Sequence, residues 1–209
     1  MNEPVHGPQP DVPSVLVDDR AAIEGPDPES LGELLAAVLA AEGVPRGAEA
    51  GLHLVSIEEM SDLNLSAMGL HGPTDVLSFP VDGGPVDDAD ADPAAGAAGA
   101  AGAAGAAGVV GVVGAATVVG SEADNPEGGA VVPHLVGDVV LCTEMAMRNA
   151  ASHAGTVVDE CRLLVVHGGL HLCGWDHATP DQRRDMWRRE RDLMASLGVA
   201  PSGDPWSLS

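Results

Sequence analysis

Three histidines in the C-terminal half of the chain leave few ways for the backbone between them to fold. His167 and His171 are four residues apart, so on a helix of 3.6 residues per turn their rings lie one above the other on the same face. His177 comes six residues after His171, and Gly174 stands between them. Glycine most easily takes the left-handed conformation that ends a helix. The spacing therefore predicts a helix that stops at Gly174 and a turn that brings His177 back to the first two rings.

Rings arranged in this way can hold one metal ion, with His167, His171 and His177 as its ligands. Three neutral nitrogen ligands leave one position of a tetrahedral zinc ion open for water, which is typical of a catalytic rather than a structural site. The spacing matches that of zinc peptidases, which place a catalytic glutamate directly after the first histidine. Here that position is Gly168. The sequence therefore predicts a metal-activated water and a hydrolase whose chemistry does not use that glutamate.

The chain is strongly acidic, with a formal net charge of -23 and arginine as its only basic residue. Such a chain should be repelled by nucleic acid at long range. Residues 1–29 carry a net charge of -6 and residues 82–127 a net charge of -8, so the rest of the chain is less acidic. Five arginines lie close together after the histidine motif, and they either form a solvated helix face or contact phosphate. These are Arg183, Arg184, Arg188, Arg189 and Arg191.

The three cysteines and the N-terminal residues indicate a reducing compartment. Cys142, Cys161 and Cys173 are odd in number and show no paired spacing. No charged segment followed by an apolar one opens the sequence, as a secretory signal would. We therefore expect a cytoplasmic protein.

Composition divides the chain into one domain and three additions. Residues 1–13 are rich in proline and are expected to form a disordered leader, and residues 198–209 a flexible tail. The domain spans 14–197 and is interrupted by a low-complexity insert at 82–133, which contains five consecutive Ala-Ala-Gly units. A membrane span within the insert is disfavoured by its glycines and by acidic flanks. We therefore expect a flexible loop and no contact with a membrane.

Hydrophobic periodicity predicts an α+β fold: a single domain with a small, mixed four-stranded sheet and about five helices. The expected strands are 14–19, 52–57, 75–80 and 138–142. The expected helices are 28–43, 58–65, 143–154, 157–172 and 179–197, the last beginning with a capping box at Thr179-Pro180-Asp181-Gln182.

Three segments resemble the YbeY endoribonuclease family: His167–His177, Gly72–Pro80 and Gly137–Cys142. The resemblance covers roughly residues 14–81 and 135–197. It implies a zinc-dependent, single-strand-specific endoribonuclease that acts late in ribosomal RNA maturation, at the 3' end of 16S rRNA, and in ribosome quality control. It also implies an α+β fold with the metal site at the end of a central helix, and one Zn²⁺ ion on His167, His171 and His177. The implied partners are single-stranded rRNA and the ribosome or its small subunit, reached directly or through a ribosomal protein.

The chain departs from the family at the segment before Gly72-Pro73-Thr74. Many members carry an arginine there that is thought to grip the phosphate, whereas this chain has Met68, and Leu70 and Gly72 replace basic residues often found after it. Other groups must then meet the phosphate charge. The candidates are Arg148 and the five arginines of the last helix.

The expected catalytic residues are His167, as a ligand of the ion, together with Asp176 and Arg148. Asp176 stands next to the third ligand, where it can orient an imidazole or accept a proton. The nucleophile is either a zinc hydroxide or the 2'-hydroxyl of the RNA. Two other functions stay open: a metallopeptidase that uses another carboxylate, such as Asp176, as base, and a non-catalytic ribosome-assembly factor in which zinc joins the last two helices.

Overall fold

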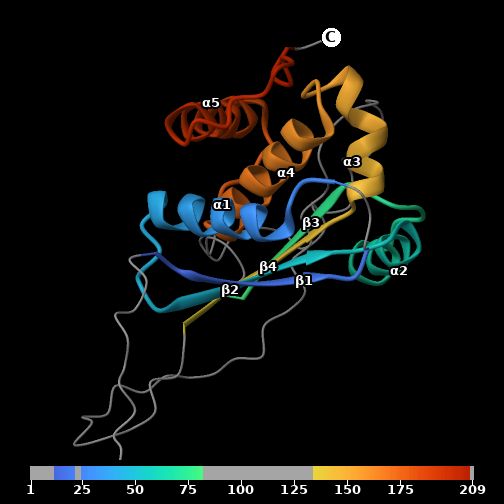
Figure 1. Cartoon of the computed structure of the whole chain (residues 1–209), viewed down its shortest axis with the longest axis horizontal. Coiled ribbons are helices and arrows are strands. Elements are labelled where there is room, and N and C mark those ends of the chain that lie inside the picture. Colours follow the sequence, from blue (N-terminus) through green and yellow to red (C-terminus); the bar gives the residue numbers. More distant parts are fainter. Residues whose placement is uncertain (1–11, 22–24, 82–133, 208–209) are drawn as a thin grey trace, which may run out of the picture.

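The computed structural model describes residues 12–21, 25–81 and 134–207. The expected leader lies mostly outside these residues and the expected insert at 82–133 lies outside them entirely. Four strands, β1 (Ser14–Asp19), β2 (Ala48–Leu54), β3 (Val76–Pro80) and β4 (His134–Leu141), form one sheet in the order β1-β2-β4-β3. β1, β2 and β4 are parallel, and β3 is antiparallel to β4. The predicted mixed four-stranded sheet is confirmed (Figure 1).

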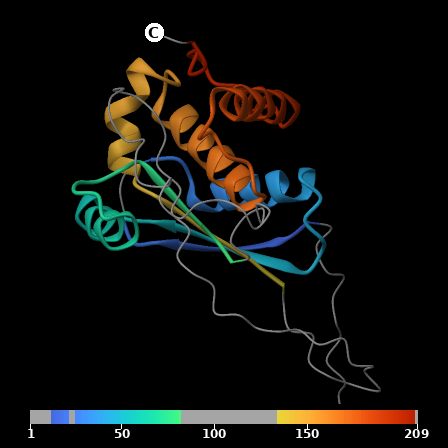
Figure 2. The same ribbon diagram turned by 180° about the vertical axis from the view of Figure 1, so that it is seen from behind.

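Five α-helices surround this sheet, as predicted. They are α1 (Pro28–Ala41), α2 (Ile57–Met68), α3 (Thr143–Asn149), α4 (Val157–Leu172) and α5 (Pro180–Ser196), and a short 3₁₀ turn, η1 (Ala150–Ser152), follows α3. α1 and α4 cover one face of the sheet, while α2 lies against the other face near the carboxyl ends of β1, β2 and β4 (Figures 1 and 2). α3 and α5 lie on opposite sides of α4. α4 is therefore the central helix that the family resemblance implied.

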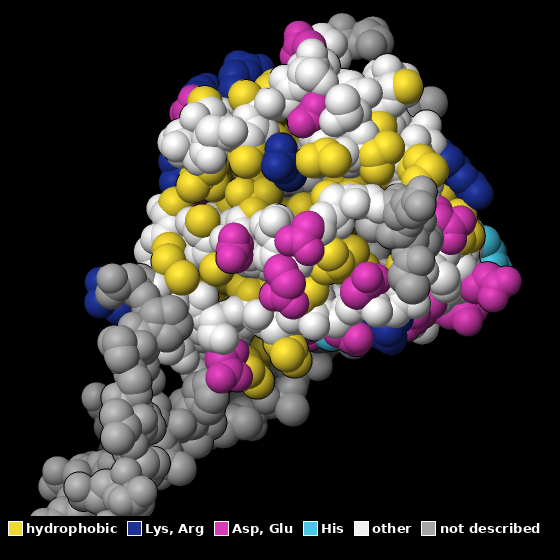
Figure 3. Space-filling view, viewed as in Figure 1, with side chains coloured by type: hydrophobic (Ala, Val, Ile, Leu, Met, Phe, Trp, Pro, Cys, Tyr) yellow, Lys and Arg dark blue, Asp and Glu magenta, His cyan; other side chains and the backbone are white. Residues whose placement is uncertain are grey.

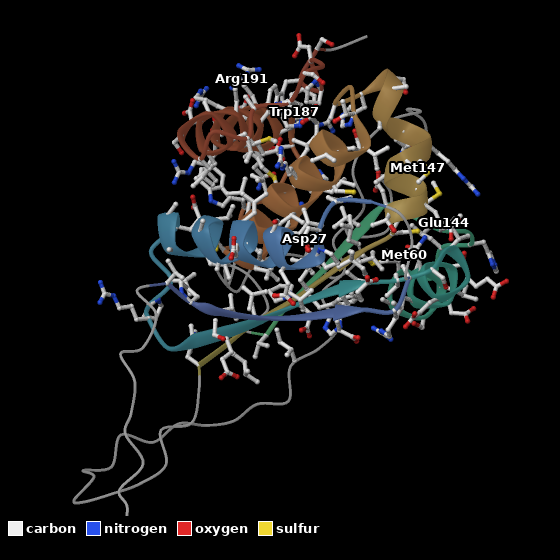
Figure 4. The ribbon with its side chains drawn as sticks, viewed as in Figure 1. Asp27, Met60, Glu144, Met147, Trp187 and Arg191 are labelled. Carbon is white, nitrogen blue, oxygen red and sulfur yellow. The ribbon has the colours of Figure 1, made fainter. Side chains whose placement is uncertain are left out.

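Two apolar clusters hold these layers together. The larger one joins the inner sides of α1, α4 and α5 to the sheet, and includes Leu35, Leu52, Val139, Leu164 and Met186, all fully buried. The smaller one lies under α2, where Met60 points between this helix and the sheet (Figure 4). Burial of apolar surface at about 25 cal/mol per Å² makes such clusters the main source of folding free energy.

Side-chain caps fix the starts of four helices, α1, α2, α4 and α5. The carboxylate of Asp27 accepts a hydrogen bond from the Ser30 backbone N–H at 3.1 Å. At α5, the Thr179 hydroxyl accepts from the Gln182 N–H at 3.2 Å, and the Gln182 carbonyl oxygen accepts from the Thr179 N–H at 2.9 Å. This reciprocal pair is the capping box that the sequence predicted. It fixes where α5 begins after the histidine motif.

Some predicted boundaries were wrong. β2 spans Ala48–Leu54 rather than 52–57, because Ser56 caps α2 and ends the extended backbone. β4 begins at His134 rather than at 138, and it carries Gly137 at φ 144° where its register against β2 shifts. Helix 143–154 stops at Asn149 and continues as η1.

Residues 198–207, expected as a flexible tail, make contacts with the folded domain that the sequence did not predict. The Gly203 backbone N–H donates to the Ala154 carbonyl at 2.7 Å, and Trp206 packs against the larger cluster. Within the described residues, no helix combines the length and the apolar character needed to cross a bilayer.

Candidate metal centre

The turn after α4 sets the position of the third histidine. Gly174 has φ 86°, which is the left-handed conformation that the sequence predicted. Its N–H donates to the His171 carbonyl at 3.0 Å, and the Trp175 N–H donates to the Leu170 carbonyl at 3.1 Å. These two bonds form a Schellman motif, which satisfies the last carbonyls of a helix and reverses the chain. The reversal brings His177 back beside α4.

The three rings converge as predicted. Their centroids are 4.6 Å apart for His167 and His171, 5.3 Å for His167 and His177, and 5.0 Å for His171 and His177. One nitrogen from each ring lies within 4.8 Å of the others. The Nε2 atoms of His167 and His171 are 3.0 Å apart. Tetrahedral zinc with Zn–N bonds of about 2.0–2.1 Å needs nitrogens about 3.3 Å apart. The Nε2 atoms of His167 and His171 are close to that spacing, and the nitrogen of His177 is near enough for the cluster to hold one metal ion if the rings close around it.

The opposite ring nitrogens of the first two histidines have acceptors, which determines where their protons are. His167 Nδ1 donates to Glu190 Oε1 at 2.5 Å, and His171 Nδ1 donates to the Trp175 carbonyl at 2.7 Å. Carboxylate and carbonyl oxygens only accept, so the protons are on Nδ1. In a neutral ring the Nε2 lone pair is then free, and it points toward the other histidines.

His177 supplies the test of whether these residues fit a metal. Its Nε2 is buried and has no hydrogen-bond partner among the described residues. An unpaired buried polar atom is costly, and in native structures it calls for a specific explanation. A cation shared with the Nε2 atoms of His167 and His171 would satisfy it. The donor set, three imidazole nitrogens, also suits zinc.

Burial keeps two of these rings neutral. Desolvation is the main cause that lowers the pKa of His171 to about 2, and the neighbouring rings of His167 and His177 lower it further. Desolvation, with the charge of His167, also lowers the pKa of His177. A neutral imidazole is the form that binds a metal, so the site is prepared for a cation rather than for protons at neutral pH.

Glu190 is the functional residue that the sequence reasoning missed. It lies on α5, only 3% exposed, and its carboxylate orients His167. The signal was present in the spacing, because Glu190 falls four residues after Met186 and three before Leu193, within the buried face of α5. A charged residue at a buried helical position needs a partner, and a histidine ligand is a suitable one.

Glu42, at the end of α1, joins the turn to α5. Its carboxylate accepts from the Trp175 indole N–H at 2.8 Å and from Arg189 Nε at 2.6 Å. Arg184 and Arg188 instead form ion pairs within α5, with Asp181 at 2.7 Å and Asp185 at 3.0 Å. Arginines gather over α5 in Figure 3, and acidic side chains gather over α1 below them.

The other two predicted catalytic residues, Asp176 and Arg148, are both exposed and contact neighbours on their own segments. Asp176 is exposed, and its carboxylate accepts from the His177 backbone N–H at 2.7 Å, so the described contact orients the turn rather than a ring. Arg148 is exposed on α3, where its guanidinium lies 3.8 Å from the Met145 sulfur. Met68 packs against the smaller apolar cluster, as expected of an apolar residue. The catalytic roles of Asp176 and Arg148 stay predictions.

Comparison with known proteins identifies the family. The model of the YbeY family, described as endoribonuclease YbeY, matches residues 23–198. This chain belongs to the YbeY family. Endoribonuclease YbeY of Salinispora tropica is 38% identical over 154 residues, 74% of this chain and 77% of that protein. The Parafrankia protein of the same name is 33% identical over 187 residues, 90% and 96% of the two chains. That of Corynebacterium glutamicum strain ATCC 13032 is 29% identical over 182 residues, 87% and 75%.

Membership confirms the family that the three sequence segments indicated, and it makes this chain an endoribonuclease, a hydrolase of phosphodiester bonds. It also agrees with the absence of a glutamate after His167. Gly168 packs directly on the sheet, where an added Cβ would lie 2.8 Å from Val139 Cγ1. A peptidase-type glutamate therefore has no room at this position.

Proposed function

We propose that this chain uses one zinc ion to cut single-stranded ribosomal RNA, that it acts late in maturation at the 3' end of 16S rRNA, and that it contributes to ribosome quality control. The observation that carries the proposal is the convergence of three imidazole nitrogens, of which His177 Nε2 is buried without a partner. Family membership supplies the substrate class. The small ribosomal subunit is the proposed partner, reached directly or through a ribosomal protein in the cytoplasm.

The chain's own residues would divide the work as follows. His167, His171 and His177 would hold the ion, which when bound supplies positive charge that polarises a phosphoryl oxygen and acidifies water. Glu190 and the Trp175 carbonyl hold the protons of the first two rings on Nδ1. Asp176, exposed beside the third ligand, is the candidate to accept a proton from the nucleophile.

Phosphate contact is proposed for arginines, because the family arginine is replaced by Met68. Arg183, exposed on α5, and Arg148, exposed on α3, are candidates. Arg184 and Arg188 are exposed as well, and their ion pairs are at the surface, where such pairs contribute only about 0–1 kcal/mol. A phosphate could therefore displace their carboxylates at little cost. The acidic remainder of the surface would confine RNA contact to the neighbourhood of these arginines.

Metal analysis paired with an RNase assay tests the proposal. Wild type should carry one zinc per chain and cut a single-stranded RNA in preference to the same sequence in a duplex, and a chelator should abolish cutting. His171→Ala should lose both metal and activity, whereas His71→Ala, an exposed histidine outside the cluster, should keep both. A 2',3'-cyclic phosphate product would identify the RNA 2'-hydroxyl as nucleophile.

The same assay separates the alternatives. A zinc-loaded, folded protein that cuts no RNA would favour a non-catalytic assembly factor in which zinc joins the last two helices. Chelator-sensitive cleavage of casein without cleavage of RNA would favour a metallopeptidase. Either result would overturn the proposal.

A further inference from the structure

The segment after α5 packs back on the domain and contacts a residue that is hydrogen-bonded to a metal ligand. Ser202 Oγ donates to Asp159 Oδ2 at 2.6 Å, which fastens the segment to the first turn of α4. The Gly203 N–H bond to Ala154 adds a second attachment. Four residues past Ser202, the Trp206 indole N–H donates to Glu190 Oε2 at 3.0 Å. The segment thus contacts the carboxylate that orients His167.

Glu190 connects the tryptophan to the metal ligand through its two oxygens. Oε1 accepts from His167 Nδ1 at 2.5 Å, and Oε2 accepts from Trp206 at 3.0 Å. The carboxylate is almost fully buried, so solvent is poorly placed to supply a substitute donor. A buried carboxylate that loses one donor is destabilised and is less firmly held in one rotamer.

The tryptophan is itself held in place. Its ring packs against the larger apolar cluster, and the Arg191 guanidinium lies over it at 5.0 Å from the centroid. Figure 4 shows Arg191 on the outer side of α5, beside the C-terminal segment. Ring packing and a cation–π contact restrict the direction of the indole N–H. The hydrogen bond to Glu190 is therefore a fixed contact.

We propose that Trp206 is a positioning residue for the metal ligand His167 and acts through Glu190. The indole N–H fixes the carboxylate, and the carboxylate fixes the orientation and tautomer of the ring whose Nε2 faces the other two histidines. The C-terminal segment is then part of the metal centre, although it contributes no ligand. This inference rests on the metal binding of the proposed function.

The expected effects follow from the distance of each group from the ligand. Loss of a hydrogen-bond partner of a ligand typically weakens metal binding about 10–100-fold, so Glu190→Gln should lower zinc affinity by about tenfold or more. Trp206 is one hydrogen bond further away, so Trp206→Phe should weaken binding about three- to fivefold. Phenylalanine keeps an aromatic ring under Arg191 and removes the N–H.

The experiment measures the zinc dissociation constant of the full chain by competition with a chromophoric chelator, together with the stability of each metal-free variant. The set is wild type, Trp206→Phe, Glu190→Gln, the double variant and the control Trp187→Phe, a partly buried α5 tryptophan outside this contact. Trp206→Phe should weaken binding in the wild-type background and should cause no further weakening in the Glu190→Gln background. Trp187→Phe should leave affinity unchanged.

Three results would overturn the inference. Unchanged affinity in Trp206→Phe would remove Trp206 from the metal centre while leaving the proposed function intact. Equal effects of Trp206→Phe in both backgrounds would show that it acts by packing and not through Glu190. Wild type that binds no zinc would remove the proposed function and this inference together. Should Trp206→Phe fail to fold, benzothienylalanine at this position keeps the bicyclic shape without the N–H, and the same measurement then decides.

Discussion

Replacing Gly168 by alanine should destabilise the domain even though alanine is the better helix former. Gly168 lies on α4 where the helix meets the sheet, and an added Cβ would lie 2.8 Å and 3.2 Å from the two Cγ atoms of Val139 and 3.0 Å from Ser78 Oγ. Val139 is fully buried, and its branched side chain has little freedom to rotate away. The helix must therefore move off the sheet, or the strand must yield.

Two opposing free energies decide the size of the effect. Alanine in place of glycine within a helix gains about 1 kcal/mol of stability. Overpacking of a filled core costs about 1–3 kcal/mol. With contacts this short against a rigid side chain, the cost should exceed the gain, and the net loss in the free energy of unfolding should be about 1 kcal/mol. For a domain of this size, that corresponds to a melting temperature lower by about 2–4 °C.

Urea unfolding of four metal-free proteins tests this reasoning. Val139→Ala alone should cost about 2 kcal/mol through the cavity that it leaves. Val139→Ala also removes both valine Cγ atoms near the new Cβ and leaves only Ser78 Oγ, so Gly168→Ala should be clearly less destabilising in the Val139→Ala background than in wild type. A Gly168→Ala protein more stable than wild type would refute the close packing, and so would an equal loss in both backgrounds.

Three further predictions are also tested by measuring the stability of variants. His153 donates to the buried Glu160 carboxylate at 2.9 Å, and this bond raises the pKa of His153. The stability that it contributes is therefore present below the unfolded pKa of about 6.5 and is lost as pH rises through the folded pKa. His153→Gln should lower the free energy of unfolding more at pH 5.5 than at pH 9, and an equal loss at both would contradict this reasoning. Zinc at 100 times its dissociation constant should stabilise wild type by about 2.7 kcal/mol, and thermal melts should show no such shift for His171→Ala. Thr179→Ala, which removes half of the capping box, should lower the free energy of unfolding by about 1 kcal/mol, and a loss within the error of the urea titration would mean that the cap is unimportant.

The parts of the structure that local signals determine were predictable from the sequence. Helix Val157–Leu172 was predicted with its bounds, and its core-facing residues Cys161, Leu164 and Val165 are all buried. The turn at Gly174 needed only the ligand spacing and the one residue type that accepts positive φ easily. Both signals lie within a few residues of the feature they predict. The metal cluster could therefore be inferred before any tertiary contact was known.

Contacts between distant segments were harder to infer. Glu190 stands among alternating arginines and acids on α5, so its charge suggested a solvated face, and its buried role depends on how α5 packs on α4. Trp206 lies in a polar, proline- and glycine-containing stretch that predicts a free tail. The start of β4 was missed because a glycine such as Gly137 usually indicates the end of a strand. Here the strand continues through Gly137, where its register against β2 shifts. In each case, the sequence did not show which distant segment the residue would pack against.

The pairing of β3 with β4 bears on how long the segment between these two strands can be. The last antiparallel partners are Pro80 and Gly137, and the Val81 N–H donates to the Val136 carbonyl at 3.0 Å, so the two ends of the 82–133 connection are already neighbours. Closing a loop between adjacent ends costs only about 0.6 kcal/mol more for each doubling of its length. Insertions or deletions between residues 82 and 133 should therefore cost the sheet little, because neither flanking strand has to shift to accommodate them.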